Sequence, residues 1–540
     1  MPSCLCGSQK NKTTNAGFNL HNINSIKMIS KRLLVFSLSL FIAVASFAQT
    51  KTPVAKTDAG LISGITDSNI NIFKGIPFAA PPVGALRWKA PQPVQPWKGT
   101  RQCDTFSASP MQAAPVPFSM WSEEFLIRKE PISEDCLYLN IWTSSTSSNK
   151  KLPVLVWIYG GGFVSGGTNV PIYDGEAMAK KGIVFVSINY RVGIFGFFAH
   201  PELTKESGYN ASGNYGILDQ IAALKWVQKN ITAFGGDPNN VTIAGQSAGS
   251  MSVNILVASP LAKGLFNKAI AESGAGFVRG FANNNLQQSE QDGTKTATSL
   301  KANSIEDLRK LPASVLMRAQ TMRGGPIIDG YVLPQPIAGI FASGKENNVT
   351  LLTGWNENEG LVFGPIKKTG DYIKQIKEQY GNNAQTILEY YPATDDSVAG
   401  ISQYKLSRDA IFGVQNYTWA NVESDQGKKV FIYRFTRKVP ATGEYVKYGA
   451  FHTGEVAYAY DNLKFVNRPW EDVDHHLADV MSSYWANFIK TGNPNSKNLP
   501  EWKAYNTKDK QVMILDITQQ STTLPDYKQL DFLYSKMKAQ

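Results

Sequence analysis

Long apolar runs, internal repeats and low-complexity segments are missing from nearly all of this 540-residue sequence. Beyond position 50, no stretch has the ~20 apolar residues that a helix needs to span a bilayer. No repeat period is visible, which argues against a repeat architecture. With 43% hydrophobic residues, the chain is too apolar for a disordered protein. The sequence therefore predicts a globular protein with enough chain to bury a large core.

Acidic residues are absent from the first 50 positions, which carry five basic residues. The formal net charge of +11 therefore falls to +6 if this segment is removed. The remaining basic residues are scattered and form no stripe, as on a mildly basic soluble surface. We therefore expect no nucleic-acid partner.

The N-terminal segment has the features of a targeting sequence. From Met28, the stretch "MISKRLLVFSLSLFIAVASFAQT" has a basic start, a short apolar run and small residues up to Ala48. We predict a signal peptide over residues 28–48, cleaved after Ala48 and preceded by an upstream extension. The alternative is an unusually long basic region that begins at Met1. The remaining domain, 49–540, would be exported to the periplasm or secreted, without a stable membrane anchor.

Cysteine is rare, with four copies, and two of them, Cys4 and Cys6, lie in the N-terminal segment. Cys103 and Cys136 remain, an even number in a chain that we expect to be exported. A single disulfide bond is one interpretation; it would close a loop of roughly 30 residues and contribute about 3–4 kcal/mol. Two free, buried thiols are the alternative.

Buried apolar segments alternate with helical ones along the chain. Strands are predicted within "LPVLVWIYGGG", "GIVFVSINY", "NVTIAG", "KAIAESG", "VTLLTG" and "KVFIYRF", the first of which ends in a glycine turn. Residues 216–236 have the apolar spacing of a helix. Buried strands separated by helices predict an α/β fold with a mostly parallel sheet. The segment 281–425 is mostly helical and polar, and we interpret it as an insertion or cap over the sheet.

The stretch "VTIAGQSAGSMSVN" places Ser247 between a predicted strand over 241–244 and a predicted helix that begins at Ala248. A lone Gly-X-Ser-X-Gly match is a weak signal. Between a strand and a helix, however, it is typical of a nucleophile elbow, whose tight turn needs small residues at Gly245 and Gly249. Ser247 is therefore a candidate nucleophile.

A serine nucleophile needs a histidine base, and the sequence contains only five histidines. In a fold with this elbow the base follows the serine in the chain, which argues against His200, in a predicted surface turn. His475 and His476 lie at the start of an amphipathic helix and are interpreted as solvated. His452 follows the predicted strand over 429–435 through a loop, and it is the candidate base.

The base needs an acid between Ser247 and His452. Glu357 and Glu359 both follow the strand "VTLLTG", and their positions alone do not decide between them. The oxyanion formed during acyl transfer needs preorganised N–H donors. We expect these from Gly161 and Gly162, which follow a buried strand, and from Ala248.

Several blocks together resemble the type B carboxylesterase family, the cholinesterase-like branch of the α/β-hydrolases. They include "FKGIPFAAPPVGALRWKAPQP", "SEDCLYLNIW", "NYRVGIFGF", "GGDPNNVTIAGQSAGSMSV", "PIIDGYVLP" and "YWANFIKTGNPN". The resemblance runs from about residue 58 to 505. It implies an α/β-hydrolase fold with helical insertions forming a cap over the site, and no metal or organic cofactor.

The resemblance also assigns roles. It implies Ser247 as nucleophile, His452 as base and Glu359, rather than Glu357, as the triad acid. Gly161, Gly162 and Ala248 would be the oxyanion donors. Ser273, in "AESG", matches a serine that often supports the triad from outside it. The pairs Arg87 with Glu134 and Arg191 with Asp219 are implied as structural ion pairs.

Three positions depart from the family pattern. Gln246 stands where a glutamate usually precedes the nucleophile, and Ser250 stands where a glycine usually follows the motif. Cys136 matches a family cysteine, but Cys103 lies about seven residues before the position expected for its partner. The resemblance therefore does not support the register of a Cys103–Cys136 bond.

The sequence predicts an exported serine carboxylesterase that forms an acyl-enzyme and acts on a small-molecule ester. One alternative is a catalytically silent, cholinesterase-like binding module. Another is the same chemistry directed at lipids, feruloyl esters or carbamates. The substrate pockets would lie in the insertions, between roughly 110–129 and 281–426, where "MWSEEF" and "FGPIKK" are candidate walls.

Overall fold

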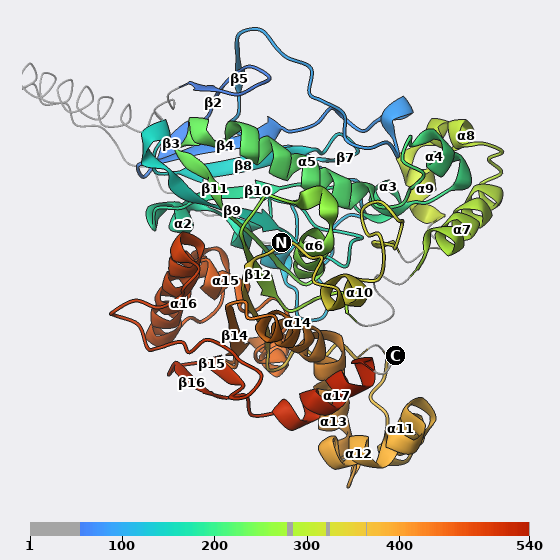
Figure 1. Ribbon diagram of the computed structural model, residues 1–540, viewed down its shortest axis with the longest axis vertical. Coiled ribbons are helices and arrows are strands. Elements are labelled where there is room, and N and C mark those ends of the chain that lie inside the picture. Colours follow the sequence, from blue (N-terminus) through green and yellow to red (C-terminus); the bar gives the residue numbers. More distant parts are fainter. Residues whose placement is uncertain (1–53, 278–283, 320–323, 363, 539–540) are drawn as a thin grey trace, which may run out of the picture. The chain divides into compact units, whose positions relative to one another are not determined.

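A large mixed sheet organises the part of the chain that the computed structural model describes, residues 54–277, 284–319, 324–362 and 364–538 (Figure 1). The sheet has 11 strands in the order β16-β15-β14-β13-β12-β11-β9-β10-β8-β4-β3. Its strands are β3 (Ile65–Asp67), β4 (Ile70–Pro77), β8 (Tyr138–Thr143), β9 (Leu152–Ile158), β10 (Val184–Ile188), β11 (Gly236–Gln246), β12 (Lys268–Glu272), β13 (Thr350–Asn356), β14 (Val430–Phe435), β15 (Gln511–Leu515) and β16 (Gln520–Thr523).

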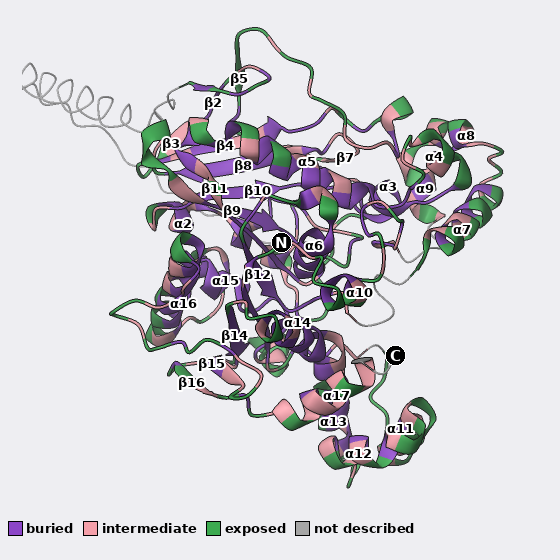
Figure 2. Cartoon of the chain, viewed as in Figure 1, coloured by how far each residue is buried: buried purple, intermediate pink, exposed green. Residues whose placement is uncertain are grey.

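The middle of the sheet is parallel and its two ends are antiparallel. Parallel pairing runs without interruption from β10 through β9, β11, β12, β13 and β14 to β15. Strands β10, β12 and β14 are buried along their whole length, as expected where helices cover both faces of a parallel sheet (Figure 2). Their apolar, β-branched and aromatic composition explains both the extended backbone and the burial.

Two small sheets lie outside the large one. The first joins β1 (Ala55–Lys56), β2 (Leu61–Ser63) and β5 (Thr100–Gln102), and the second joins β6 (Ser109–Pro110) and β7 (Ile132–Ser133).

Helices fill the connections between the parallel strands. Helix α6 packs on β11 and β12, and α14 packs on β13 and β14. The helices of the described chain are α2 (Glu176–Lys180), α3 (Gly193–Phe197), α4 (Pro201–Glu206), α5 (Tyr215–Asn230), α6 (Ala248–Ala258), α7 (Leu286–Ser299), α8 (Ile305–Lys310), α9 (Ala313–Arg318), α10 (Ile337–Ala342), α11 (Thr369–Tyr380), α12 (Ala384–Tyr390), α13 (Asp396–Arg408), α14 (Val414–Asp425), α15 (Val456–Ala459), α16 (Asp472–Thr491) and α17 (Tyr527–Lys538). A π-helical turn, η8 (Asp409–Gly413), joins α13 directly to α14.

The carboxyl ends of five neighbouring strands, β9, β11, β12, β13 and β14, meet at one edge of the sheet. In open α/β sheets, ligands bind outside this edge. The chain segments that leave it carry the candidate residues: the glycine loop after β9, Ser247 after β11, Ser273 after β12, Glu359 after β13 and His452 after β14. The topology therefore brings together residues up to 291 positions apart in the sequence, from Gly161 to His452.

The predicted fold class is confirmed, and so are the individual strands and the helix after the elbow. The predicted helix over 216–236 is α5, which ends earlier, at Asn230. The segment 281–425 is helical in its described parts, as expected, apart from β13. Part of this segment is not a solvated surface layer, because most residues of α14 are buried.

Two local predictions turn out differently. His200 is not in a surface turn; it is buried, and its Nδ1 accepts a hydrogen bond from the N–H of Glu202 at the start of α4. Cys103 and Cys136 are both buried free thiols, so the structure does not contain the disulfide bond considered from the sequence. Burial raises the pKa of the Cys103 thiol to about 11 and that of Cys136 well above its ordinary value, which keeps both in the unreactive thiol form.

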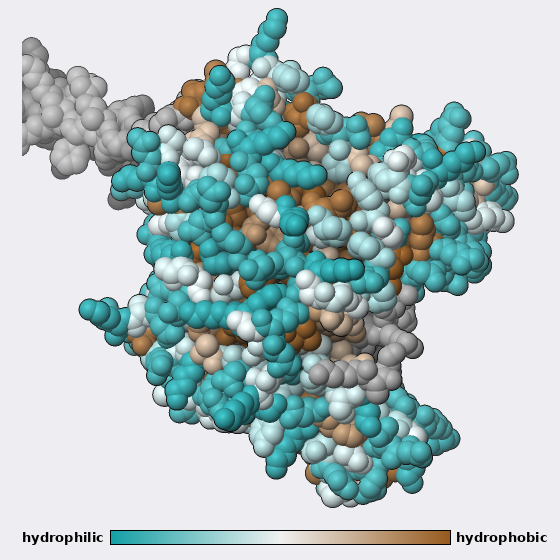
Figure 3. Space-filling view, in the orientation of Figure 1, coloured by the Kyte–Doolittle hydropathy of each residue, from teal (hydrophilic) through white to brown (hydrophobic). Residues whose placement is uncertain are grey.

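Residues Lys51–Gln540 form one compact unit. The predicted signal peptide over 28–48 and the cleavage site after Ala48 lie outside the described residues. Within those residues, no helix has both the length and the apolar character needed to cross a membrane. The face in Figure 3 is mostly hydrophilic, with hydrophobic side chains in small separate groups.

Candidate active site

Ser247 lies on a sharp turn between β11 and α6. Its backbone has φ 59° and ψ −124°, a strained conformation for a residue with a side chain. The N–H of Ser247 donates to the carbonyl of Glu272 at 2.9 Å, which fixes the turn against the end of β12. A Cβ atom at Gly249 would lie 2.0 Å from the carbonyl oxygen of Ile158, so no larger residue fits there. These are the features of the nucleophile elbow that the sequence predicted.

His452 and Glu359 form a buried pair close to the elbow. The imidazole Nδ1 lies 2.9 Å from Oε2 of Glu359, and both side chains are almost inaccessible to solvent. The other carboxylate oxygen, Oε1, accepts the backbone N–H of Asn356 at 2.8 Å. Glu359 is therefore fixed from two directions and holds one nitrogen of His452, which leaves Nε2 available for other contacts.

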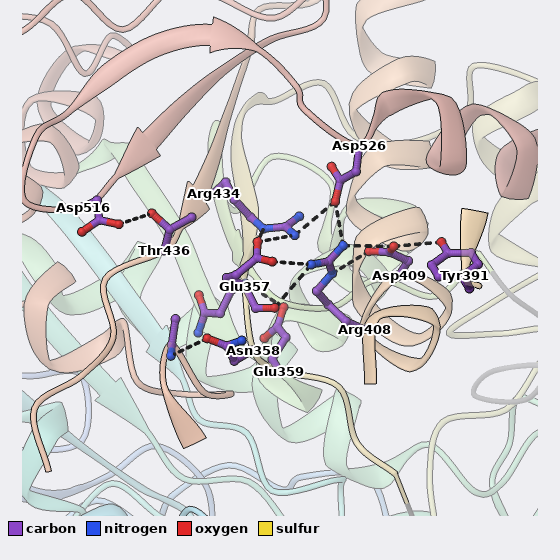
Figure 4. Close-up of polar contacts among 12 residues, drawn as sticks. Glu357, Asn358, Glu359, Tyr391, Arg408, Asp409, Arg434, Thr436, Asp516 and Asp526 are labelled. Atoms are coloured by element: carbon purple, nitrogen blue, oxygen red, sulfur yellow. Dashed lines mark hydrogen bonds and ion pairs between the residues drawn. The ribbon is translucent and has the colours of Figure 1, made fainter. Parts of the chain in front are cut away.

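Glu357, the rival acid, lies in a different environment (Figure 4). Its carboxylate accepts hydrogen bonds from Arg408 at 2.9 Å and from Arg434 at 2.8 Å. Burial works against the charge, but Arg434 and Arg408 overcome it and hold the pKa of Glu357 below its ordinary value. The two arginines also bind Asp526, and Arg408 binds Asp409. Glu357 therefore anchors the loop that carries Glu359, and among the described residues it makes no hydrogen bond or ion pair with His452.

Gln246 contacts the candidate base directly. Its amide nitrogen lies 3.2 Å from Nε2 and 3.4 Å from Nδ1 of His452. Ser247 directly follows Gln246 in the chain. Among the described residues, its hydroxyl makes no hydrogen bond. Catalytic hydrogen bonds are often long in structures without substrate, so this does not argue against a Ser247–His452 pair.

Two aromatic side chains enclose the imidazole of His452. The ring of Phe412 stacks on it, with centroids 4.3 Å apart and planes 20° apart. The indole of Trp121 approaches at 6.2 Å and 85°. Phe412 lies on the π-helical turn η8, and such turns are frequent at functional sites. These contacts restrict how far the imidazole can rotate.

The glycine loop after β9 presents backbone N–H groups near the elbow. Gly161 and Gly162 have φ of 113° and 62°, which favour glycine, and both are exposed. A Cβ atom on the preceding Gly160 would lie 3.0 Å from Cβ of Ser247, so the loop passes directly beside the nucleophile. Within the described chain, the N–H groups of Gly161 and Gly162 have no hydrogen-bond acceptor. Ala248 begins α6, and its N–H belongs to the first turn, which has no partner inside the helix.

Two other serines were singled out from the sequence. Ser250 donates from its hydroxyl to the carbonyl of Gly274 at 2.6 Å, which ties α6 to the segment after β12. Ser273 is fully buried with φ 56°, and its backbone N–H donates to the carbonyl of Gly354. Its hydroxyl has no partner among the described residues, so its predicted support of the triad is not visible as a hydrogen bond.

Two fully buried carboxylic acids, Glu272 and Glu455, lie close to the same segments. Glu272 accepts hydrogen bonds from Trp485 at 2.8 Å and from Tyr460 at 3.0 Å. Glu455 accepts one from the side-chain amide of Asn356. Burial raises the pKa of Glu272 to about 7, and burial together with the neighbouring carboxylates Glu272 and Glu359 raises the pKa of Glu455 well above its ordinary value. Neither acid is balanced by a buried cation in the described residues.

Among the described residues, no group of three or more histidine, cysteine, aspartate or glutamate side chains could hold a metal ion. The two ion pairs implied from the sequence are present: Arg87 binds Glu134 at 2.6 Å, and Arg191 binds Asp219 at 2.7 Å.

A mostly parallel sheet with a serine elbow after β11, an acid after β13 and a histidine after β14 defines an α/β-hydrolase. A model of the carboxylesterase family matches residues 51–533. The chain therefore belongs to the carboxylesterase family and is a carboxylic ester hydrolase.

Several relatives match the chain over most of its length. The fumonisin B1 esterase of Sphingopyxis macrogoltabida is 37% identical over 485 residues, which cover 86% of this chain and 87% of that protein. The para-nitrobenzyl esterase of Bacillus subtilis (strain 168) is 33% identical over 490 residues, 86% of this chain and 94% of that protein. Liver carboxylesterase 1 of Oryctolagus cuniculus is 33% identical over 503 residues, 85% of this chain and 87% of that protein.

The sequence reasoning missed several residues of the site. Phe412 lies 40 positions before His452 and follows no motif, so nothing in the sequence indicated that its ring stacks on the imidazole. Trp121 belongs to "MWSEEF", a candidate pocket wall in the sequence. Gln246 departs from the family pattern, but only the structure shows its contact with His452.

Proposed function

We propose that the protein hydrolyses carboxylic esters through an acyl-enzyme, with Ser247 as nucleophile, His452 as base and Glu359 as the orienting acid. The observation that carries this proposal is the buried 2.9 Å contact between His452 and Glu359, beside an elbow that presents Ser247 next to the glycine loop. A serine, a histidine and a glutamate that come together from the ends of three strands support a serine-hydrolase triad.

The proposed mechanism has two halves. In the first, Nε2 of His452 takes the proton of the Ser247 hydroxyl as its oxygen bonds to the ester carbonyl carbon. His452 then gives that proton to the leaving alcohol as the ester bond breaks. In the second, His452 takes a proton from water as the water oxygen bonds to the acyl carbon. His452 returns that proton to the Ser247 oxygen as the acyl–serine bond breaks and the carboxylic acid leaves. Glu359 holds the imidazole in the required tautomer and stabilises its charged form.

Backbone N–H groups of Gly161, Gly162 and Ala248 are proposed to bind the oxyanion. A single donor of this kind contributes about 3–4 kcal/mol of transition-state stabilisation. Because the N–H groups of Gly161 and Gly162 have no acceptor in the described chain, they are available to a substrate oxygen at no cost in internal hydrogen bonds.

We further propose that the preferred esters carry an apolar or aromatic group. Phe118, which is 59% exposed, packs against Trp121 with ring centroids 4.8 Å apart and planes 46° apart. Val164, in the glycine loop, is 44% exposed. Exposed apolar side chains next to a catalytic centre favour apolar substrates. The names of the relatives, a fumonisin B1 esterase and a para-nitrobenzyl esterase, fit ester hydrolysis without selecting one substrate.

The decisive experiment is Ser247→Ala, with p-nitrophenyl acetate and butyrate as substrates and a fluorophosphonate probe as a covalent label. We expect loss of turnover and of labelling with an unchanged melting temperature. Ser343→Ala, at the exposed end of α10, is the matched control and should retain both. Turnover near the wild-type rate in Ser247→Ala would exclude the serine mechanism, and absence of labelling in the wild type would favour a silent binding module.

The substrate preference is tested separately. We expect kcat/KM to rise with acyl-chain length across p-nitrophenyl esters, with methyl ferulate and a carbamate as aromatic and nitrogen-containing comparisons. A preference for acetate over every longer chain would contradict the apolar preference.

The protein is proposed to be exported after cleavage behind Ala48. Expression of the full chain in a bacterial host, followed by N-terminal sequencing of the mature protein, should give Gln49 as the first residue. A mature protein that still begins at Met1 or Met28 would overturn this proposal.

A further inference from the structure

Thr453, the residue directly after His452, has a strained backbone. Its φ is 82°, and it is the only β-branched residue among the described non-glycine residues with positive φ. A β-branched side chain in this region is a genuine outlier that costs about 1–3 kcal/mol. The residue is buried, so solvent contacts do not account for the conformation. Strain of this kind persists where surrounding contacts require it, which directs attention to what the side chain touches.

The hydroxyl of Thr453 connects two residues of the active site. The indole N–H of Trp121 donates to it at 3.1 Å, and the hydroxyl itself donates to Oε1 of Gln246 at 3.4 Å. An indole nitrogen can only donate, so the threonine oxygen must accept from Trp121. The single proton of the hydroxyl is then free for Gln246.

This arrangement fixes which end of the Gln246 amide faces His452. Because the carbonyl oxygen faces the Thr453 hydroxyl, the NH₂ group faces the imidazole, 3.2 Å from Nε2 and 3.4 Å from Nδ1. Oε1 of Gln246 also lies close to Gly160, where a Cβ atom would approach it to 3.3 Å. Trp121, Thr453 and Gln246 therefore form a hydrogen-bonded chain that ends at the candidate base, and we call these three residues the relay.

We propose that Thr453 is a positioning residue: its hydroxyl orients the Gln246 amide and so holds His452 in its working position. The inference rests on the proposed role of His452 as the base. Glu359 holds Nδ1, Phe412 stacks on the ring, and the relay supplies the remaining contact, from a third part of the chain. The strained backbone is the conformation that brings the hydroxyl between Trp121 and Gln246.

The relay also sets the polarity that the base experiences. An NH₂ group beside the imidazole favours its neutral form, whereas a carbonyl oxygen there would favour the protonated form. If the Thr453 hydroxyl is removed, the amide is free to turn its oxygen toward His452. The titratable groups near this ring are few in the described chain: Glu359 is in direct contact, and Glu455 is close enough to Glu359 to interact with its carboxylate. A change in the orientation of Gln246 should therefore move the acid limb of the pH–rate profile.

The test is a set of substitutions at Thr453 with p-nitrophenyl butyrate as substrate. Thr453→Gly removes the hydroxyl and relieves the strain, because glycine adopts positive φ freely. We expect an equal or higher melting temperature, a kcat lowered by about 10-fold with KM within about 2-fold, and an acid limb moved to higher pH. Thr453→Ser keeps the hydroxyl and should restore both kcat and the acid limb.

A second variant protects the test against a folding defect at position 453. Trp121→Phe keeps an aromatic ring and removes only the N–H, and we expect a smaller loss of kcat in the same direction. If the three residues act as one unit, the double variant Trp121→Phe/Thr453→Gly should be no slower than Thr453→Gly alone. Fully additive losses would show that the two residues act independently and would overturn the relay.

The outcomes separate this inference from the proposed function. Wild-type kcat and an unmoved acid limb in Thr453→Gly would overturn the relay while leaving Ser247→Ala inactive. A serine variant as slow as the glycine variant would show that the hydroxyl is not the working group. Activity in Ser247→Ala would instead remove the proposed triad, whatever the Thr453 variants do.

Discussion

Two clusters of carboxylic acids lie near Glu359, one partly exposed and one fully buried, and their charges are neutralised in opposite ways. Glu357 and Asp526 bind the guanidinium groups of Arg408 and Arg434, and despite burial these cations hold the pKa values of both acids below their ordinary range (Figure 4). Glu272 and Glu455 receive only neutral donors, and burial raises their pKa values. The first cluster is neutralised by counter-ions and the second by protons.

The presence or absence of a nearby cation distinguishes the environments of the two neighbouring glutamates, Glu357 and Glu359. A carboxylate that orients a histidine needs hydrogen bonds that fix it, but no strong cation that would compete for it. Glu359 has this setting, whereas Glu357 is committed to two arginines. Asp409 shows how delicate the balance is, because complete burial raises its pKa even beside Arg408.

The most direct test of this difference is to replace the carboxylate of Glu359 and that of Glu357, one at a time, by an amide. We expect Glu359→Gln to lower kcat by about 10⁴-fold, because the amide cannot hold the imidazole in the required tautomer. Glu357→Gln should keep kcat within a few-fold and lose about 1 kcal/mol of stability, since a partly exposed hydrogen-bonded charge is removed. Steady-state kinetics and urea unfolding measure the two effects. Equal losses of kcat in both variants would mean that Glu357 also serves the triad.

Removal of a cation should affect the first cluster most. Arg408→Met leaves Glu357, Asp409 and Asp526 with one arginine between them, and Asp409 loses its only guanidinium contact in the described chain. Breaking a buried ion pair by removing one partner costs about 3–5 kcal/mol. Urea unfolding should show this loss, while Arg318→Met, at the exposed end of α9, should stay within about 0.5 kcal/mol of the wild type. A loss for Arg408→Met as small as that of the control would show that the cluster relaxes without it.

The comparison also shows what the sequence could and could not predict. The α/β fold, the parallel strands and the elbow at Ser247 follow from local patterns, because buried strands and a glycine-framed serine leave signals within a few residues. His452 could be selected because histidine is rare in the chain. The choice of Glu359 over Glu357 needed a resemblance, because both residues follow the same strand.

What the sequence could not predict depends on contacts between distant segments. Arg408 and Arg434 neutralise Glu357 from α13 and β14, and neither is near it in the chain. The burial of His200 could not be predicted, because the residues around it are typical of a surface turn. In the structure its imidazole accepts the hydrogen bond that caps α4. The positive φ of Thr453 has no local signal at all, since threonine usually avoids that conformation.

The second cluster should respond to pH, and Glu272→Gln isolates this response. Because the pKa of Glu272 is about 7 in the folded chain and 4.5 is its ordinary value, the folded state holds the proton more tightly. The resulting stabilisation is complete below about pH 4.5 and is lost as the pH rises through about 7. Glutamine can accept the same hydrogen bonds from Trp485 and Tyr460 without titrating. Relative to this variant, wild-type stability should therefore fall on the order of 1 kcal/mol per pH unit across that window.

Unfolding curves collected at several pH values measure this slope, and Glu378→Gln, at an exposed position of α11, is the control. Glu455, Tyr173, Tyr433 and Tyr460 also surround Glu272 and remain in the variant, so only the contribution of one proton is removed. A slope identical in Glu272→Gln and the wild type would show that Glu272 stays ionised in the folded protein.

The smallest change in stability is expected for an ion pair at the surface, where water solvates the charged groups. Glu176 binds Lys180 at 2.5 Å and Lys464 at 2.7 Å, and both lysine side chains are about half exposed. Pairs of this kind contribute about 0.2–1 kcal/mol and are screened by salt. Glu176→Gln should therefore lower stability by less than about 1 kcal/mol in dilute buffer, and the difference should vanish at high salt. The loss in Arg408→Met should persist at high salt, because dissolved ions do not reach Asp409, its fully buried partner. If high salt abolished the stability loss in both Glu176→Gln and Arg408→Met, the arginine cluster would be as open to solvent as the surface pair. The contrast between it and the buried, protonated cluster of Glu272 and Glu455 would then not hold.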